Sequence, residues 1–276
     1  MAADFTIQSG GVTLSADESG DGPTVLLLHG LTATRRYVVM GSKMLERSGH
    51  RVIKYDARGH GHSSPAPSPD AYTYDLLAAD AIAMLDARGV ERAVLAGASM
   101  GAHTLLNVAL RHPERVTGVV VITPAYSGDP VGEERLERWD RLSEGLRTGG
   151  VEGFIEAMGD PATSTPGLAD TVLKVARQRL SEHDHLDALA DALSALPRSR
   201  PFASLEDLAA VTVPAVVVAS NDDADPEHPQ ALGIAYAQAL PNARLITDAP
   251  GRSPVAWQGS QLSQIIAEVV ACSGLG

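Results

Sequence analysis

The fold is decided by one short stretch, Ala93 to Gly101, which reads AVLAGASMG. Its first four residues are apolar and predict a buried strand, whereas the residues from Met100 onward predict a helix. Ser99 therefore lies at a sharp strand-to-helix turn, with one glycine two residues before it and another two residues after it. Glycine leaves room where a strand and a helix come so close. Such a turn pushes the Ser99 hydroxyl out above the sheet and points helix N–H groups at any anion formed there.

Outward from this turn, short apolar runs alternate with helical patterns. A continuous apolar run over 24–28, which ends in His29-Gly30, predicts a fully buried strand. Further strands are predicted over 51–56, 116–122, 213–219 and 243–248, and helices over 38–48, 75–88, 100–111 and 260–272. This alternation predicts an α/β fold, in which a mostly parallel central sheet is flanked by helices.

Residues 126–200 interrupt the alternation. They contain no strand-like run, and their helical patterns lie over 133–146, 151–158, 168–180 and 186–196. We therefore expect residues 1–125 to form the first part of the α/β core, residues 126–200 an all-helical cap, and residues 201–276 the second part of the core. Ligands of such sheets bind at the carboxyl ends of the strands, which the cap would cover.

Several motifs occur in order along the chain. His29-Gly30 follows a strand, YDARGHGHS occupies 55–63, GASMGA occupies 97–102, and an acid-bearing loop follows the helical insertion. Together they resemble the α/β-hydrolase fold family over nearly the whole chain, most closely its capped esterase, lactonase and C–C hydrolase branch. The resemblance implies Ser99 as a nucleophile on the family's elbow turn. It also implies the amides of Leu31 and Met100 as donors to a substrate oxyanion, which are worth roughly 3–4 kcal/mol.

The same resemblance implies a catalytic acid after the strand at 213–219. The family pattern there is close to Gly-x-x-Asp-x-x-x-Pro, and Ala219, Asp222 and Pro226 occupy its fixed places. Asp222 is the expected acid, with Asp223 and Asp225 as alternatives. A solvated acidic turn without a catalytic role is the other interpretation.

The histidine of the family should follow in a Gly-His-x-Pro turn, where this chain has Gly251-Arg252-Ser253-Pro254. Arginine has a pKa above ~12 and no acceptor atom, so Arg252 cannot take the Ser99 proton. His228, on the acid loop, is the preferred replacement. The alternatives are His103, one turn along the helix after Ser99, and the cap residues His183 and His185, whose surroundings are more typical of a solvated helix start.

Arg252 itself has two interpretations. At the mouth of the site it could bind a substrate carboxylate or phosphate, with Arg35 and Arg36 adding to the same site. It could instead form a salt bridge with Asp222 or a neighbouring acid.

No metal and no nucleotide cofactor are expected. His60 and His62 are two residues apart without a third ligand nearby, which is a poor pattern for zinc. The chain has no glycine-rich phosphate loop and no cysteine cluster. The buried position predicted for His29 favours a structural role.

The composition of the chain limits the classes of partner and the cellular location that we expect. Lys and Arg number 22 and Asp and Glu number 34, so the net charge of −12 argues against nucleic acid or an anionic membrane as the main partner. The small-molecule substrate is what the family resemblance implies. The single cysteine, Cys272, excludes an internal disulfide, and no signal-peptide pattern or membrane-spanning run is present. A cytoplasmic location is therefore expected, and both a monomer and a homodimer remain open.

The expected function is hydrolysis of a small-molecule ester, thioester or lactone through Ser99, with Asp222 orienting His228. The alternative is a catalytically degenerate hydrolase that binds a small ligand, or a non-hydrolytic, lyase-type enzyme, because Arg252 occupies the histidine position.

Overall fold

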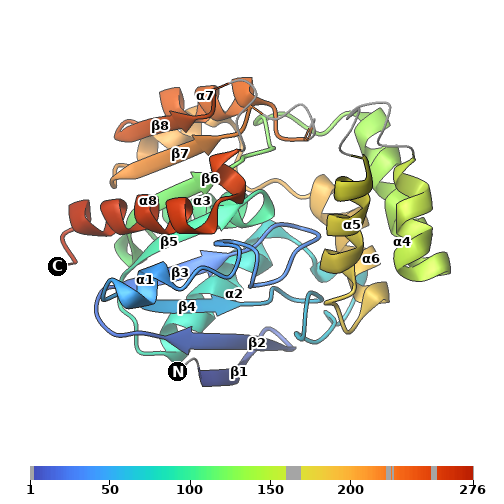
Figure 1. Cartoon of the computed structure of the whole chain (residues 1–276), viewed down its shortest axis with the longest axis horizontal. Coiled ribbons are helices and arrows are strands. Elements are labelled where there is room, and N and C mark those ends of the chain that lie inside the picture. The colour runs from blue at the N-terminus through green and yellow to red at the C-terminus, as the bar shows by residue number, and fades with distance from the viewer. Residues whose placement is uncertain (1–2, 160–168, 222–224, 226, 250–253, 276) are drawn as a thin grey trace.

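The computed structural model describes residues 3–159, 169–221, 225, 227–249 and 254–275. At its centre is an eight-stranded sheet with the order β1-β2-β4-β3-β5-β6-β7-β8 (Figure 1). The strands are β1 (Ala3–Ser9), β2 (Val12–Ser19), β3 (Thr24–Leu28), β4 (Arg51–Tyr55), β5 (Ala93–Ala98), β6 (Val116–Ile122), β7 (Ala215–Ala219) and β8 (Ala243–Thr247).

Strand direction changes only at one side of the sheet. β1 and β2 form an antiparallel hairpin, β2 also runs antiparallel to β4, and the neighbours from β4 to β8 are parallel. β3, β6 and β7 are buried along their whole length, because helices cover both of their faces. The predicted mostly parallel α/β sheet is confirmed.

Helices pack on both faces of the sheet. α2 (Tyr74–Ala87), α3 (Met100–Arg111) and α7 (Gln230–Ala239) cover one face, and α1 (Met44–Arg47) and α8 (Gly259–Cys272) cover the other. Alternate residues of each buried strand point to the two faces, so Leu26 packs with the first set and Leu27 with the second. Short 3-10 helices cover Pro69–Ala71, Pro113–Arg115, Leu196–Arg198, Leu205–Ala210 and Val255–Trp257.

The helix expected over 38–48 is shorter than predicted. Met40 and Gly41 have φ angles of 47° and 75°, which lie in the left-handed region that a right-handed helix cannot include. Only α1 remains helical in this segment. The apolar residues Val38 and Val39 are still buried under α8, so the periodicity that suggested a helix reflects burial of a turn.

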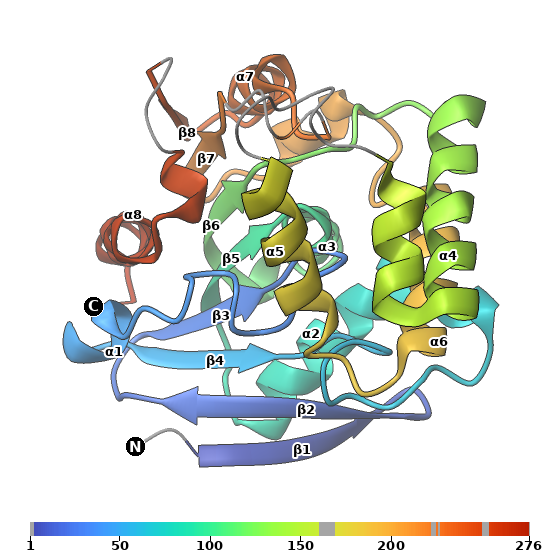
Figure 2. The same cartoon turned by 45° about the vertical axis from the view of Figure 1, so that its right-hand side comes forward.

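The helical insertion lies between β6 and β7 and consists of α4 (Glu133–Met158), α5 (Ala169–Leu180) and α6 (Leu186–Ala195). It stands beside the carboxyl ends of the parallel strands (Figures 1 and 2). α4 reverses direction at Gly150, where φ is 61°, and the two arms pack together at Gly145 and Gly153. A Cβ atom on Gly145 would lie 2.4 Å from the Gly153 carbonyl oxygen, so only glycine allows this approach. Across the described ranges, no helix is long and apolar enough to cross a membrane.

Candidate active site

Ser99 occupies the turn between β5 and α3, at the carboxyl edge of the sheet. Its φ and ψ are 51° and −113°, a strained conformation for a residue with a side chain. A Cβ atom on Gly97 would lie 2.5 Å from the backbone of Gly101, and one on Gly101 would lie 2.1 Å from the Leu28 carbonyl oxygen. Both glycines are therefore required by backbone contacts, as the sequence predicted for this turn.

His228 lies between β7 and α7 and reaches Ser99 from there. Its Nε2 is 2.8 Å from Ser99 Oγ, and its Nδ1 is 2.8 Å from each carboxylate oxygen of Asp225. When Nδ1–H donates to Asp225, the Nε2 lone pair faces the Ser99 hydroxyl and accepts its proton. The side chains of His228 and Asp225 are only 17% and 22% exposed, so water competes little with these hydrogen bonds.

The structure thus brings together two of the three residues expected to be catalytic. Ser99 and His228 are in contact, and the acid beside them is Asp225, which the sequence offered as an alternative to Asp222. Asp222 and Asp223 lie outside the described residues, and so does Arg252. At the end of β8, both carboxylate oxygens of Asp248 accept a hydrogen bond from the backbone N–H of Val255 at 3.0 Å.

The expected oxyanion donors flank Ser99. The loop after β3 touches it, because a Cβ atom on Gly30 would lie 3.5 Å from the Ser99 Cβ atom. Met100 is the first residue of α3, so its N–H has no partner within the helix. In the part of the chain that the structure describes, neither the Leu31 nor the Met100 amide donates a hydrogen bond to another group. Both N–H groups therefore remain free for a ligand.

Buried histidines hold the loop that carries Leu31. The Nδ1–H of His29 donates to the Gly30 carbonyl at 2.8 Å, and this carbonyl belongs to the same peptide group as the Leu31 N–H. His29 Nε2 accepts from the Ala57 amide at 2.9 Å. His60 contacts the Leu31 carbonyl at 2.8 Å. Burial lowers the pKa of His29 to about 3, so this ring is neutral and fixes the peptide plane.

The alternative bases are engaged elsewhere. His103 Nε2 accepts from the backbone N–H groups of Ala125 and Tyr126, and its Nδ1 contacts the Tyr74 hydroxyl. Burial lowers the pKa of His103 to about 3, so it cannot carry a proton near neutral pH.

The expectation that His183 is solvated is wrong. It is buried, and its Nδ1 accepts from the Gly61 amide at 2.9 Å, because the segment after α5 docks on the loop after β4. His185 is exposed. His62 pairs at the surface with Asp184, and the described residues contain no group of three potential metal ligands.

Arg35 and Arg36 do not join the site. Arg35 bonds to Asp17 at 3.0 Å and to Asp56 at 2.8 Å, so it ties the edge of the sheet to the loop after β4. Arg36 is 64% exposed and lies 3.7 Å from Glu182.

Sequence reasoning also missed an ion-pair clamp on the loop that carries His228. Glu227 lies between Asp225 and His228 in the chain, and its carboxylate pairs with Arg135 at 2.9 Å and with Arg138, both from α4. α4 therefore holds the segment that carries both Asp225 and His228. The sequence pattern could not indicate this contact, because Arg135 and Glu227 are 92 residues apart in the chain.

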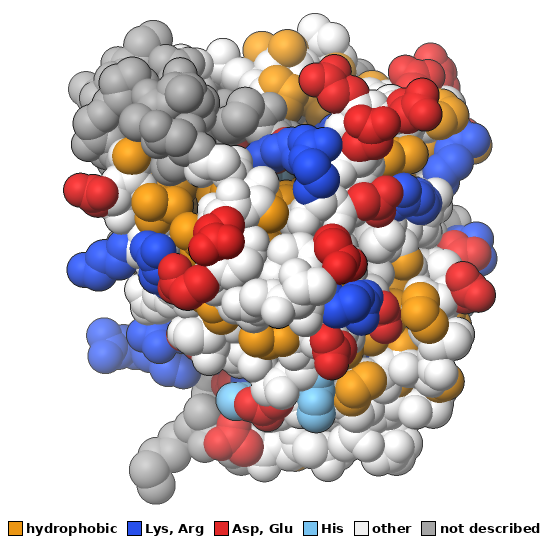
Figure 3. All heavy atoms as spheres, turned by 90° about the vertical axis from the view of Figure 1, so that its right-hand side faces the viewer, with side chains coloured by type: hydrophobic (Ala, Val, Ile, Leu, Met, Phe, Trp, Pro, Cys, Tyr) orange, Lys and Arg blue, Asp and Glu red, His pale blue; other side chains and the backbone are white. Residues whose placement is uncertain are grey.

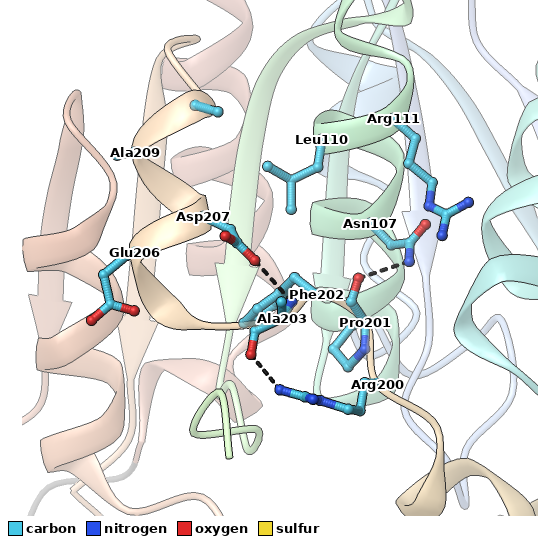
Figure 4. Close-up of a pocket in the computed structure, with 11 residues that line it drawn as sticks. Asn107, Leu110, Arg111, Arg200, Pro201, Phe202, Ala203, Glu206, Asp207 and Ala209 are labelled. Atoms are coloured by element: carbon cyan, nitrogen blue, oxygen red, sulfur yellow. Dashed lines mark hydrogen bonds between the residues drawn. The ribbon is translucent and has the colours of Figure 1, made fainter. Parts of the chain in front are cut away.

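A hollow in the described part of the chain lies away from Ser99. It measures about 760 Å³ and is formed by the far end of α3 and the segment 200–210 (Figure 4). Its polar groups are largely used within the protein, since Asn107 donates to the Pro201 carbonyl at 2.7 Å and Asp207 accepts from the Ala203 amide at 2.8 Å. This hollow has no contact with the Ser99–His228 pair.

Comparison with known proteins agrees with the serine-histidine geometry, because the matching family and the similar proteins are hydrolases. The model of the alpha/beta hydrolase fold family matches residues 23–166. A protein named putative carbamate hydrolase RutD from Variovorax paradoxus is 30% identical over 74% of this chain and 75% of its own length. Epoxide hydrolase B from Mycobacterium tuberculosis is 34% identical over 41% of this chain and 34% of its own length.

Solved structures share the whole fold. An esterase from Thermogutta terrifontis, solved with malate bound, superposes with a TM-score of 0.77 at 25% identity and covers 98% of both chains. An enol-lactonase from Burkholderia xenovorans gives a TM-score of 0.76 at 22% identity and covers 97% of this chain and 100% of its own. The chain belongs to the α/β-hydrolase family.

Proposed function

We propose that this protein is a serine hydrolase that cleaves a small-molecule ester, thioester or lactone, with Ser99 as nucleophile, His228 as base and Asp225 as the acid that orients His228. The observation that carries the proposal is the continuous chain of contacts from Asp225 through His228 to Ser99 Oγ, each at 2.8 Å. This is the arrangement of a nucleophile, a base and an orienting acid that activates a serine hydroxyl.

The geometry supports a two-step reaction. Ser99 Oγ attacks the substrate carbonyl while His228 Nε2 takes its proton, and the amides of Leu31 and Met100 receive the negative charge that forms on the carbonyl oxygen. His228 then gives the proton to the leaving alcohol or thiol. Water hydrolyses the acyl-Ser99 ester in the second step, with His228 taking the proton of the attacking water and returning it to Ser99.

The chemistry of a serine nucleophile also distinguishes between the two reactions for which the relatives are named, carbamate hydrolysis and epoxide hydrolysis. Opening an epoxide with Ser99 would form an alkyl ether, which water does not cleave, so the enzyme would stop after one turnover. A carbonyl substrate forms an ester with Ser99, and this ester can be hydrolysed. Attack by Ser99 therefore fits esters, lactones and carbamates, and it does not fit epoxides.

Labelling of Ser99 by a fluorophosphonate probe, followed by mass spectrometry, tests the proposal without knowledge of the substrate. Wild-type protein should be labelled at Ser99, whereas Ser99→Ala should not react. His228→Ala should slow labelling by at least about 100-fold, because general-base help is worth roughly 10²–10⁴ in rate. His62→Ala removes an exposed histidine and should have no effect. A folded wild-type protein that stays unlabelled for hours would instead favour the ligand-binding alternative.

A further inference from the structure

One half-buried arginine of the cap has no anionic partner among the residues that the structure describes. Arg179 lies in the last turn of α5, and its guanidinium stacks on the ring of Tyr37 at 5.4 Å. Its Nε atom is fully buried and has no hydrogen-bond partner in the described part of the chain. Within the described ranges, no carboxylate lies at ion-pairing distance from it. An unpaired guanidinium in this setting is costly, because burial removes water from the charge.

Most other arginines of the cap are used within the protein. Arg135 and Arg138 share Glu227, and the remaining pairs are Arg147 with Asp191, Arg177 with Glu152, and Arg198 with Asp140. Arg141 has no ion pair, but it is exposed and therefore solvated. The outer face of the cap accordingly shows basic and acidic side chains side by side (Figure 3). Arg179 differs from these residues in being both covered and unpaired.

Two described carboxylates in the surroundings of Arg179 are already engaged. Glu182, in the turn that follows α5, accepts hydrogen bonds from Thr34 and Tyr37, both at 2.9 Å. Asp225 is close enough for its charge to act on Arg179, but both of its oxygens are bonded to His228. The guanidinium fork of Arg179 is therefore left without an anion from the described residues, and it lies within the electrostatic range of Asp225, the acid of the proposed catalytic chain.

The geometry points to Arg179 as the site that binds a carboxylate carried by the substrate, at a distance from the bond that is cleaved. A planar guanidinium pairs with a carboxylate through two parallel hydrogen bonds. A monoanion balances the single charge of Arg179, whereas a phosphate dianion would add a net negative charge next to Asp225. This inference rests on the proposed function and names its substrate class as half-esters of dicarboxylic acids and related anionic esters.

Matched ester pairs test the inference. Phenyl hydrogen glutarate and phenyl hydrogen succinate carry the free carboxylate, and their methyl esters are neutral controls with the same acyl skeleton. Wild-type kcat/KM should be higher for the half-esters. Arg179→Gln should lower kcat/KM for the half-esters by about 10- to 100-fold, which is the range for loss of a charge-assisted hydrogen bond. Its effect on the neutral esters should stay within about threefold. Arg177→Gln, on the same helix, removes an exposed arginine paired with Glu152 and should change neither class.

A stability measurement separates this role from a structural one. Arg179→Met keeps the bulk of the side chain and removes an unpaired charge, so its Tm should equal or exceed that of the wild type while the preference for half-esters is lost. A clear fall in Tm together with equal losses on both ester classes would overturn the inference, and so would the absence of any half-ester preference in the wild type.

Binding to the Ser99→Ala protein makes the test independent of turnover. Monomethyl glutarate should bind this variant in calorimetry, and the double variant Ser99→Ala/Arg179→Gln should bind it at least about tenfold more weakly. If Ser99 fails to react with fluorophosphonate but this difference is found, the carboxylate site stands and the hydrolase proposal falls. If Ser99 reacts and the difference is missing, the hydrolase proposal stands and the carboxylate site falls.

Discussion

The clamp on Glu227 makes the reactivity of Ser99 depend on the cap. Glu227 is the residue immediately before His228, and its carboxylate bridges Arg135 and Arg138 of α4. Glu227→Gln removes both ion pairs while it keeps the size of the side chain. We expect the loop with Asp225 and His228 to leave its position against Ser99 for part of the time, so that Ser99 loses its base.

The size of the expected loss in Ser99 labelling rate can be derived from the solvent exposure of the paired side chains. The two arginine side chains are 37% exposed and that of Glu227 is 22% exposed, so solvent screens each pair. Pairs of this kind contribute roughly 0.2–1 kcal/mol each, which gives about 0.4–2 kcal/mol for the two pairs of the clamp. At the upper end, a change of about 2 kcal/mol corresponds to a factor of about 30 in a two-state population. The rate of Ser99 labelling should fall by up to this factor.

The assay is the second-order rate constant of fluorophosphonate labelling at 0.05 M and 1 M NaCl. Salt shortens the Debye length from about 10 Å at 0.1 M to about 3 Å at 1 M, so wild-type protein should slow toward the rate of Glu227→Gln, and the variant should respond little. Glu268→Gln breaks the surface pair with Arg244 and serves as the control. A Glu227→Gln rate within twofold of wild type at both salt concentrations would refute the clamp.

Further predictions concern the base, the oxyanion loop, the elbow and acid stability. Arg252→Ala should leave Ser99 labelling within about threefold of wild type, whereas Asp225→Asn should lower it by at least about tenfold, because Asp225 orients the proposed base His228; the reverse pattern in the labelling assay would show that Asp225 does not orient the base. His29→Asn should lower kcat by roughly tenfold with little change in KM, because the Leu31 amide loses its fixed direction. Gly101→Ala should destabilise the fold by at least about 2 kcal/mol in urea unfolding, because its Cβ atom would meet backbone, whereas Gly149→Ala, with nothing within 4 Å, should be neutral or stabilising. His29, His103 and His183 have a folded pKa of about 3, below the value of 6.5 in the unfolded chain; their contribution is complete above pH 6.5 and is lost as pH falls, so these three side chains should together take up about three protons on unfolding near pH 5, and His183→Gln should reduce the measured proton uptake by about one.

The features predicted correctly from the sequence are those that neighbouring residues determine. The Ser99 turn follows from two glycines and a strand-helix junction, and the buried strands follow from continuous apolar runs. His228 could be proposed because it lies on a loop that ends at the same edge of the sheet as Ser99. The choice between Asp222 and Asp225 depended on side-chain directions within a short loop, which no periodicity encodes.

The failures have a common physical origin in contacts between distant segments. Val38 and Val39 are buried by α8, so their pattern imitated a helix that Met40 and Gly41 interrupt. His183 stands in a polar run, yet docking of the cap on Gly61 buries it. The local sequence around Arg179 and Glu227 gave no indication of their roles. Those roles depend on distant segments: α4 supplies ion-pair partners to Glu227, whereas no described carboxylate pairs with Arg179.

Sheet order explains how a histidine on this loop can reach Ser99. β7 is two strands from β5 and β8 is three strands away, and neighbouring strands are about 4.8 Å apart. A histidine after β7 therefore starts roughly 10 Å from the serine strand, and one after β8 roughly 14 Å from it. The shorter path lets Asp225 and His228 come from one turn, closed by a 3.2 Å hydrogen bond from the His228 amide to the Asp225 carbonyl. Asp225 and His228 then lie on one short segment, and because Glu227 lies between them, we expect its ion pairs with α4 to hold both side chains against Ser99.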